Sequence, residues 1–488
     1  MKIHYFILIF CLTFLSFSSQ SQISFFKTYS DNGYDKGEGI VQLQDSSYLV
    51  TGSSSSFTES SQAFIMKVDS LGNRLWSNHY GGTETEKGRR IFHVPGDGIY
   101  VVGQTNSYPN KFFDAYFFKT DLSGGLLFEK NYGGNEFEDI HDAVMLKDTS
   151  FILVGETQST TNEIENLFIL RINKFGDTLW TKNFGSEGKD VARSIKMLND
   201  TTCIIAGEYY VSDSLTQKAL VLRMHINGTQ EWLKTYGDLG KYVLNDLILD
   251  NGEIKTVGYN QENLAIEGNN KQCMMKMDSD GNLIYIYSEE HIGDFSFEHI
   301  VKFSSALDDY YYVSKVLNSP DIPTYNDGYD AVIYKFDNSM VYNFIFMKPA
   351  FTGTGNDMPN EIIPCSDGGA ILVGYNELNG TNVFLAKIAA NNYFPFNDML
   401  PDISNLVSVK EEEKSKFKIF PNPVEKEIIL VNYPFKSTRI SIQNQLGVEI
   451  LALGNFQEKI NIESLNSGMY FLVLENEKSK EIIKFIKN

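Results

Sequence analysis

The sequence predicts an all-β protein, made of a seven-bladed β-propeller followed by a small Ig-like β-sandwich. Aromatic residues make up 13% of the chain, and Tyr and Phe far outnumber Trp, which favours strands over helices. A pattern with a period of about 52 residues recurs seven times, as expected of a repeat fold. After the last copy, several short alternating strands with a different pattern fill the C-terminal segment.

The first 22 residues have the pattern of a secretory signal. Met1-Lys2-Ile3-His4 gives a positively charged start, an apolar run extends from Tyr5 to Phe17, and small polar residues lead to Gln22. A membrane span needs about 20 apolar residues, more than this run supplies. We therefore expect a signal peptide at 1–22 and a mature chain without a transmembrane segment.

Charge and cysteine usage exclude several classes of function. The formal net charge is −20, and no stripe of Lys and Arg occurs, so we expect no nucleic-acid partner. The cysteines are widely spaced with no CxxC pair, unlike a zinc site or a disulfide framework. Cys203 and Cys273 lie in apolar strand patterns and are expected to be buried free thiols.

In each repeat a basic residue is followed nine positions later by an aromatic residue. The pairs are Lys67/Trp76, Lys119/Phe128, Arg171/Trp180, Arg223/Trp232, Lys276/Tyr285, Lys335/Phe344 and Lys387/Phe396. An apolar run lies upstream of each pair and ends at Gly52, Gly103, Gly155, Gly207, Gly258, Ser314 and Gly374. Each copy reads as four short strands, in the first copy 39–44, 47–53, 63–69 and 74–80.

Seven units of four strands predict a β-propeller over residues 23–397, because radial closure protects the sheet edges. A β-helix is the alternative, although its rungs are usually shorter. Phe25–Tyr29 is similar to the fourth strand 232–236, so it could complete the last blade; Phe396 competes for that position. The steps Tyr80-Gly-Gly82 and Tyr132-Gly-Gly134 resemble those of β-propeller repeats in secreted bacterial proteins.

Residues that recur in every blade are expected to build the ring. Trp76, Trp180 and Trp232 resemble an aromatic ligand cage, but packing between blades explains their regular position better. The recurring Gly72, Gly124, Gly176, Gly228 and Gly281 suggest a turn with positive φ. The acids Asp35, Glu86, Glu138 and Asp190 are expected to accept local hydrogen bonds rather than to form a metal-binding ring.

Function is expected where the repeat breaks, in the longer loops of the fifth and sixth blades. Loops on a rigid scaffold often carry binding residues, and neutral insertions are the competing explanation. The candidate ligand-binding residues are Tyr259, Glu262, Tyr325, Asp327, Tyr329 and Asp330, a mixture of aromatic and polar groups suited to a sugar or a peptide.

Catalytic signals are missing from the sequence, since no HExxH, G-x-S-x-G or phosphate loop occurs. We therefore predict no catalytic residues, cofactor or metal, and a non-enzymatic protein that binds a glycan, peptide or protein partner. The alternative is an extracellular polysaccharide hydrolase or lyase that acts in the central funnel of the ring.

The C-terminal segment is a separate module, joined to the ring by a charged linker at 398–415. Residues 416–488 contain Pro421-Asn422-Pro423, a step from Gly468 and Tyr470 into an apolar strand, and a basic last strand with Lys484 and Lys487. In this order, these motifs resemble the type A sorting domain of bacterial type IX secretion. The resemblance implies that the secretion machinery is a partner, and that the protein is released or attached at the outer cell surface.

Overall fold

The computed structural model divides into two compact units, Met1–Pro401 and Asp402–Asn488, which are described separately. The structure describes residues 24–31, 33–56, 60–107, 112–160, 164–212, 216–238, 240–261, 270–288, 294–302, 309–317, 329–337, 355–377, 380–389, 418–420, 424, 426–431, 439–444, 449–454, 459–466, 468–475 and 480–487. Within these ranges all regular structure is strand, and we find no helical membrane span among them.

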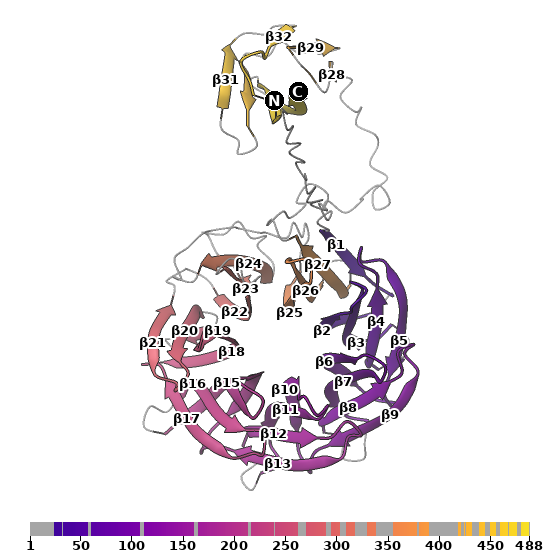
Figure 1. The fold of residues 1–488 in the computed structure, drawn as a ribbon, viewed down its shortest axis with the longest axis vertical. Helices are drawn as coiled ribbons and strands as arrows, with labels where there is room; N and C mark the ends of the chain where they lie inside the picture. Colours follow the sequence, from indigo (N-terminus) through magenta and orange to yellow (C-terminus); the bar gives the residue numbers. More distant parts are fainter. Residues whose placement is uncertain are drawn as a thin grey trace, which may run out of the picture. The chain divides into compact units, whose positions relative to one another are not determined.

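The first unit is a ring of seven antiparallel sheets, each a blade of consecutive strands (Figure 1). Blades 1 to 3 are β2 (Asp35–Gln42), β3 (Tyr48–Ser54), β4 (Gln62–Val68), β5 (Arg74–Tyr80); β6 (Glu86–Val94), β7 (Gly98–Thr105), β8 (Asp114–Thr120), β9 (Leu126–Tyr132); and β10 (Glu138–Met145), β11 (Phe151–Thr157), β12 (Asn166–Ile172), β13 (Thr178–Phe184). Blades 4 and 5 are β14 (Val191–Met197), β15 (Thr202–Val211), β16 (Thr216–His225), β17 (Gln230–Tyr236); and β18 (Lys241–Asp250), β19 (Glu253–Gln261), β20 (Lys271–Asp278), β21 (Leu283–Ser288). Blade 6 has β22 (Asp294–Lys302), β23 (Asp309–Leu317) and β24 (Tyr329–Asp337), and blade 7 has β25 (Asp357–Pro364), β26 (Ala370–Asn376) and β27 (Asn382–Ile388). The predicted propeller is confirmed, and the β-helix alternative is excluded.

The N-terminal strand β1 (Phe25–Tyr29) closes the ring by pairing with β27 as the fourth strand of blade 7. Phe25 lies opposite Lys387, in the position that Trp76 takes opposite Lys67 in blade 1. The predicted completion of the last blade by Phe25–Tyr29 is therefore confirmed, and Phe25 rather than the competing Phe396 holds the position opposite Lys387. Phe396 itself lies outside the described residues.

Apolar side chains between successive blades form the core. One cluster joins Ile65 and Tyr80 of blade 1 to Val101 and Phe118 of blade 2, and Trp76 packs against it. Trp180 donates from Nε1 to the Ile226 carbonyl of the next blade at 3.1 Å. These contacts confirm that the tryptophans pack between blades. Cys203, Cys273 and Cys365 are buried free thiols.

The recurring tyrosines and glycines tie successive blades together. The hydroxyl of Tyr132 donates to the Gly176 carbonyl of the next blade at 2.6 Å, and Tyr80 makes the equivalent bond to Gly124 at 2.7 Å. Gly176 has a φ of +78°, which confirms the predicted turn. Burial raises the pKa of the Tyr80 phenol to about 12, so the hydroxyl remains a donor at neutral pH.

The recurring acids accept hydrogen bonds from nearby turns and strands, as predicted. Glu86 Oε1 accepts from Thr105 Oγ1 at 2.7 Å, and its Oε2 accepts from the Gly82 N–H at 3.0 Å. Glu138 is bonded in the same way by Thr157 and Gly134. Asp35 and Asp190 likewise accept from the N–H groups of Asp31 and Ser186, so the acids fix the entry into blades 1 to 4.

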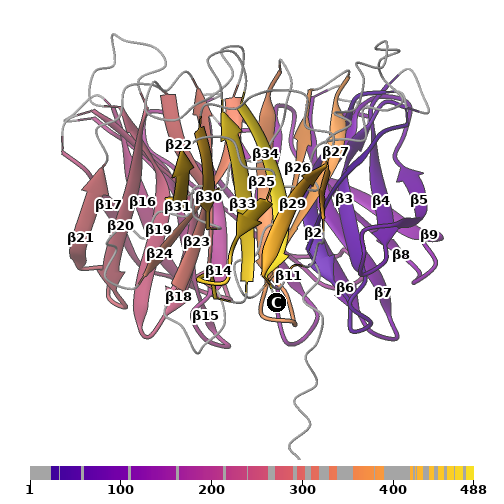
Figure 2. The same ribbon diagram turned by 90° about the horizontal axis from the view of Figure 1, so that it is seen from above.

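The second unit contains two small sheets (Figure 2). One comprises β28 (Lys418–Phe420), β29 (Glu427–Val431) and β32 (Lys459–Asn461). The other has the order β31 (Glu449–Gly454), β30 (Arg439–Gln443), β33 (Gly468–Glu475) and β34 (Lys480–Lys487). Ile428, Ile460, Leu472 and Phe485 belong to one buried core to which both sheets contribute, as in a sandwich.

Candidate functional site

The first strand of every blade carries one extra residue at the same place. The pairing register shifts there, at Glu38, Arg89, His141, Arg193, Asn245, Glu298 and Asn360. A β-bulge leaves its extra residue unpaired and re-aims the side chains around it. The first strands are the innermost of the ring (Figure 1), so the bulges act around its central channel.

These seven extra residues line a cavity of about 140 Å³, to which all seven blades contribute. Arg90, His299 and Pro359, each next to a bulge residue, complete the lining. We call this space the channel cavity. Three of the chain's seven arginines lie in it, although the chain as a whole is strongly acidic.

A belt of polar residues holds the inner strands together. It comprises Arg90, Asp142, Ser194, Lys196, Asp246, His299 and Glu361. Asp142 Oδ2 accepts from the Ile195 N–H of the next blade at 2.9 Å, and Glu361 Oε2 accepts from the Ile40 N–H at 2.7 Å. The belt therefore bridges successive blades, and its main role is structural.

Electrostatics in the belt favour the charged forms of two acids. Burial alone would raise the pKa of Asp142, but Lys196 and Arg90 outweigh it and hold that pKa below its ordinary value. Burial likewise opposes ionisation of Asp246, and Lys196 and His299 lower its pKa nevertheless. Glu361 differs, because burial raises its pKa and Arg90, at 3.6 Å, offsets only part of this effect.

Ion pairs surround the cavity arginines without using all their donors. Arg193 Nη2 lies 2.6 Å from Glu208, which also pairs with Lys241 at 3.3 Å. Arg89 Nη2 lies 2.8 Å from Asp139. A guanidinium has five N–H donors, and Arg193 makes no other hydrogen bond among the described residues. The arginine can therefore donate to a further group in the cavity.

A possible metal cluster next to the cavity is better explained as an ion-pair network. Asp139, His141 and Glu156 each offer a ligand atom, and these atoms lie within 4.8 Å of one another. However, Arg89 is paired with Asp139, and Lys189 Nζ lies 3.1 Å from Glu156. Burial opposes ionisation of Glu156, yet His141 and Lys189 lower its pKa to about 2. Cations of the chain already neutralise both acids, so we assign no metal.

The predicted loop residues are only partly described, and the described ones are not a single group. Tyr259 belongs to β19, where the Lys241 ammonium lies 5.9 Å from its ring centroid; Lys241 in turn pairs with Glu208 beside the cavity. Tyr329 begins β24, and its N–H donates to Asn356 Oδ1 at 3.0 Å. Asp330 lies next in β24, opposite Val316. Glu262, Tyr325 and Asp327 lie outside the described residues.

Sequence reasoning missed the bulge residues. When the repeats are aligned on Gly52, Gly103, Gly155 and Gly207, the residues Glu38, Arg89, His141 and Arg193 fall in one column. Such a column, always polar but chemically different in each copy, is the signal that identifies them.

In the second unit, the predicted sorting residues that are described lie on its last two strands. Gly468 of β33 lies opposite Lys487 of β34, and Lys484 lies opposite Phe471. Tyr470 stacks on Phe485 with ring centroids 5.8 Å apart. Pro421, Asn422 and Pro423, like the predicted signal at 1–22, lie outside the described residues.

Comparison with known proteins identifies the C-terminal segment. Residues 418–488 match the family model of the secretion system C-terminal sorting domain. This match confirms the predicted sorting domain, and with it export to the outer surface or beyond. No curated protein sequence matches the chain.

Several solved structures are similar at low identity. The Pan2 WD40 domain of Neurospora crassa is 12% identical with a TM-score of 0.46, over 73% of this chain and 91% of that one. PorZ, an essential surface component of the type IX secretion system of Porphyromonas gingivalis, is 11% identical with a TM-score of 0.41, over 92% of this chain and 59% of that one. The extracellular domain of BT4673 from B. thetaiotaomicron is 10% identical with a TM-score of 0.41, over 96% and 59%. Likenesses of this size carry no information on ligand or activity.

Proposed function

We propose that this exported propeller is a non-enzymatic binding protein at the outer cell surface, and that its channel cavity takes a carboxylate group of an acidic glycan or peptide. The observation that carries the proposal is the cavity itself. All seven inner strands place bulge residues in it, and these include Arg89 and Arg193 in an otherwise acidic protein.

Arginine suits this role because its planar guanidinium binds a carboxylate through two parallel hydrogen bonds. Burial alone would lower the pKa of Arg193, but Glu208 outweighs that effect, so the side chain remains charged. Asn245 and Asn360 on other blades donate through Nδ2 to the ring itself, to the Phe297 carbonyl at 2.9 Å and the Gly37 carbonyl at 2.7 Å, so they add their amide oxygens as neutral acceptors. Different groups around one cavity favour an asymmetric ligand over a symmetric ion.

The test is calorimetric titration of the full chain with trigalacturonate and hexaglutamate, each against a neutral counterpart, maltotriose and hexaglutamine. We expect at least one acidic probe to bind and the neutral probes not to bind. Arg193→Gln should weaken binding by about tenfold or more, because a charge-assisted pair is lost. Arg439→Gln, on an exposed ion pair of the second unit, is the matched control.

Two results would contradict the proposal. One is equal binding of acidic and neutral probes. The other is unchanged affinity in Arg193→Gln. Added salt should weaken the binding of an acidic probe, since the attraction is between charges.

Catalysis in the same cavity is the second candidate function, and His141 is the residue that favours it. Its Nε2 lies 3.6 Å from Glu156 and has no hydrogen-bond partner among the described residues, so it resembles a base next to an orienting acid. Incubation with polygalacturonate and assay of new reducing ends or unsaturated products tests this function. If products form with the unmodified protein but not with His141→Gln, the cavity is a catalytic site for hydrolysis or lysis and not a binding site alone.

A further inference from the structure

The boundaries between blades contain equivalent spaces of very different size. At the start of blade 1, next to the bond from Tyr29 to Gly72, a cavity of only about 20 Å³ remains. At the start of blade 3, next to the bond from Tyr132 to Gly176, the cavity is about 370 Å³. Strand register makes the two spaces equivalent, since Phe64 lies opposite His79 in blade 1 as Phe168 lies opposite Asn183 in blade 3. We call the larger space the blade 3 pocket.

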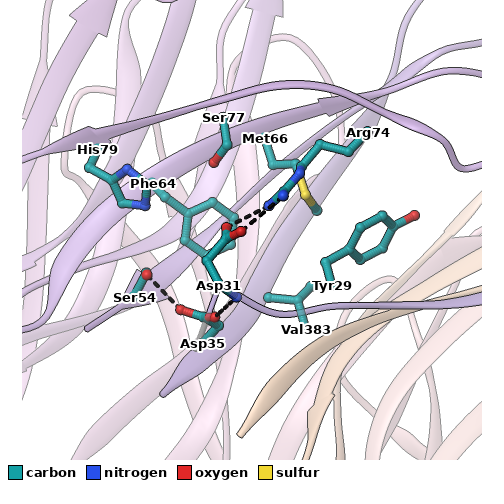
Figure 3. A pocket seen from close by; sticks show the side chains of 10 residues that line it. All are labelled: Tyr29, Asp31, Asp35, Ser54, Phe64, Met66, Arg74, Ser77, His79 and Val383. Carbon is teal, nitrogen blue, oxygen red and sulfur yellow. Dashed lines mark hydrogen bonds and ion pairs between the residues drawn. The ribbon is translucent and has the colours of Figure 1, made fainter. Parts of the chain in front are cut away.

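An ion pair closes the space in blade 1. Arg74 reaches across it to Asp31, with Nη1 and Nη2 at 2.5 and 2.9 Å from the two carboxylate oxygens (Figure 3). In blade 3, Thr178 stands at the position of Arg74, and Gly134 stands at that of Asp31. The long paired side chains are therefore replaced by short ones, and the pocket opens.

Larger side chains occupy the key positions in two other blades. In blade 2, the Tyr116 hydroxyl donates to Glu129, which stands where blade 3 has Thr181. In blade 4, Leu233 stands at that position and packs against the core. Blade 3 therefore differs from blades 1, 2 and 4 in having short polar residues at the positions of both Thr178 and Thr181.

The blade 3 pocket offers neutral polar groups beside an aromatic wall. Thr178, Thr181 and Asn183 are exposed, and their side chains make no hydrogen bond within the described part of the chain. The half-buried Tyr132 and a small part of Phe168, which is 6% exposed, supply apolar surface. The one charged residue in the lining, Glu138, already accepts from Thr157 Oγ1 at 2.5 Å and from the Gly134 N–H at 3.0 Å.

We propose that the blade 3 pocket binds one neutral hexose unit of a glycan. A sugar ring has hydroxyls that can pair with threonine and amide side chains, and a C–H face that packs on aromatic rings. The pocket volume lies at the lower end of the range typical of small-molecule sites. No cation lines it, so an acidic ligand would lack a counter-charge. The blade 3 pocket shares no lining residue with the channel cavity, so this proposal does not depend on the proposed channel function.

Saturation-transfer NMR of the full chain with the methyl glycosides of glucose, galactose, mannose and N-acetylglucosamine tests the proposal. A methyl hexoside has about 13 heavy atoms, and at about 0.3 kcal/mol for each of them it should bind with a dissociation constant of about 1 mM. Thr181→Leu places in blade 3 the residue that blade 4 already carries, and should weaken binding by about tenfold or more. Lys182→Leu is the matched control on β13, because Lys182 faces the next blade and lies beside Gly228.

Thr178→Arg, which introduces the residue of blade 1, is a second blocking variant if Thr181→Leu does not fold. Loss of binding in either folded variant, with binding retained in Lys182→Leu, supports the site. Absence of binding of all four glycosides to the unmodified chain would overturn the proposal. So would full binding by both blocking variants. Trigalacturonate titrated in the same samples reports separately on the channel cavity.

Discussion

Asp246→Asn should destabilise the propeller strongly, because Asp246 is a buried charge with several partners. It is 7% exposed and accepts from Ser194 Oγ at 2.7 Å and from the Ile300 N–H at 3.2 Å, with Lys196 at 3.4 Å. Removal of one partner from a buried ion pair typically costs about 3–5 kcal/mol. Asparagine keeps one acceptor oxygen, and Lys196 keeps Asp142, so we expect about 3 kcal/mol.

Guanidinium unfolding followed by tryptophan fluorescence measures this loss. All three tryptophans, Trp76, Trp180 and Trp232, lie in the ring, so the signal reports on the propeller alone. Asp200→Asn is the control, because Asp200 pairs with Lys147 at 2.6 Å on the surface, where both side chains are largely exposed. An exposed pair contributes at most about 1 kcal/mol.

The pH dependence of the stability difference shows whether the charge of Asp246, rather than the shape of its side chain, stabilises the ring. The pKa of Asp246 is lower in the folded state than in the unfolded state. Its contribution is therefore complete above the unfolded pKa and is lost as the pH falls through the folded value. The stability difference between the wild type and Asp246→Asn should persist from about pH 8 to 5 and shrink only in stronger acid. A difference below about 1 kcal/mol at pH 7 would refute the structural role of the belt.

Three further predictions concern the ring and its export. Tyr132→Phe should lower the free energy of unfolding by about 1 kcal/mol in the same assay, because the hydrogen bond to the Gly176 carbonyl is lost. Phe184→Tyr supplies the hydroxyl that blade 3 lacks and should not lower it. Equal losses in the two variants would contradict a stabilising Tyr–Gly bond. Deletion of Phe25–Tyr29 should expose the edge of β27 and accelerate limited proteolysis of the ring, and an unchanged cleavage rate would argue against closure by β1. Deletion of 418–488 should leave the protein in the periplasm, as shown by fractionation and immunoblotting, and normal secretion would contradict the sorting role.

The ring was predictable because its repeated residues have repeated physical roles. The pairing of Lys67 with Trp76 and the turn at Gly72 recur at constant spacing, so one copy explains the others. Closure was harder to predict, because it depends on a pairing between Phe25 and Lys387, which are far apart in sequence. The competing candidate Phe396 has the expected spacing, and spacing alone cannot choose between them.

The candidate sites were less predictable, because they depend on differences between copies. A bulge is one extra residue, and Arg89 or Arg193 becomes meaningful only when seven blades bring such residues around one channel. The blade 3 pocket arises in the same way, from Thr178 where blades 1, 2 and 4 have longer side chains, and from Thr181 where blades 2 and 4 have Glu129 and Leu233. The loop hypothesis relied on insertions, and of its three described residues Tyr259 is the one linked to the channel cavity, through Lys241 and Glu208.

A crystal structure of the protein soaked with trigalacturonate is the most direct test of the proposed channel function. Binding in the channel predicts that electron density for a carboxylate appears in the cavity, within hydrogen-bond distance of Arg193 or Arg89. Density confined to the outer rim, or an empty channel at a concentration that saturates binding in solution, would contradict it.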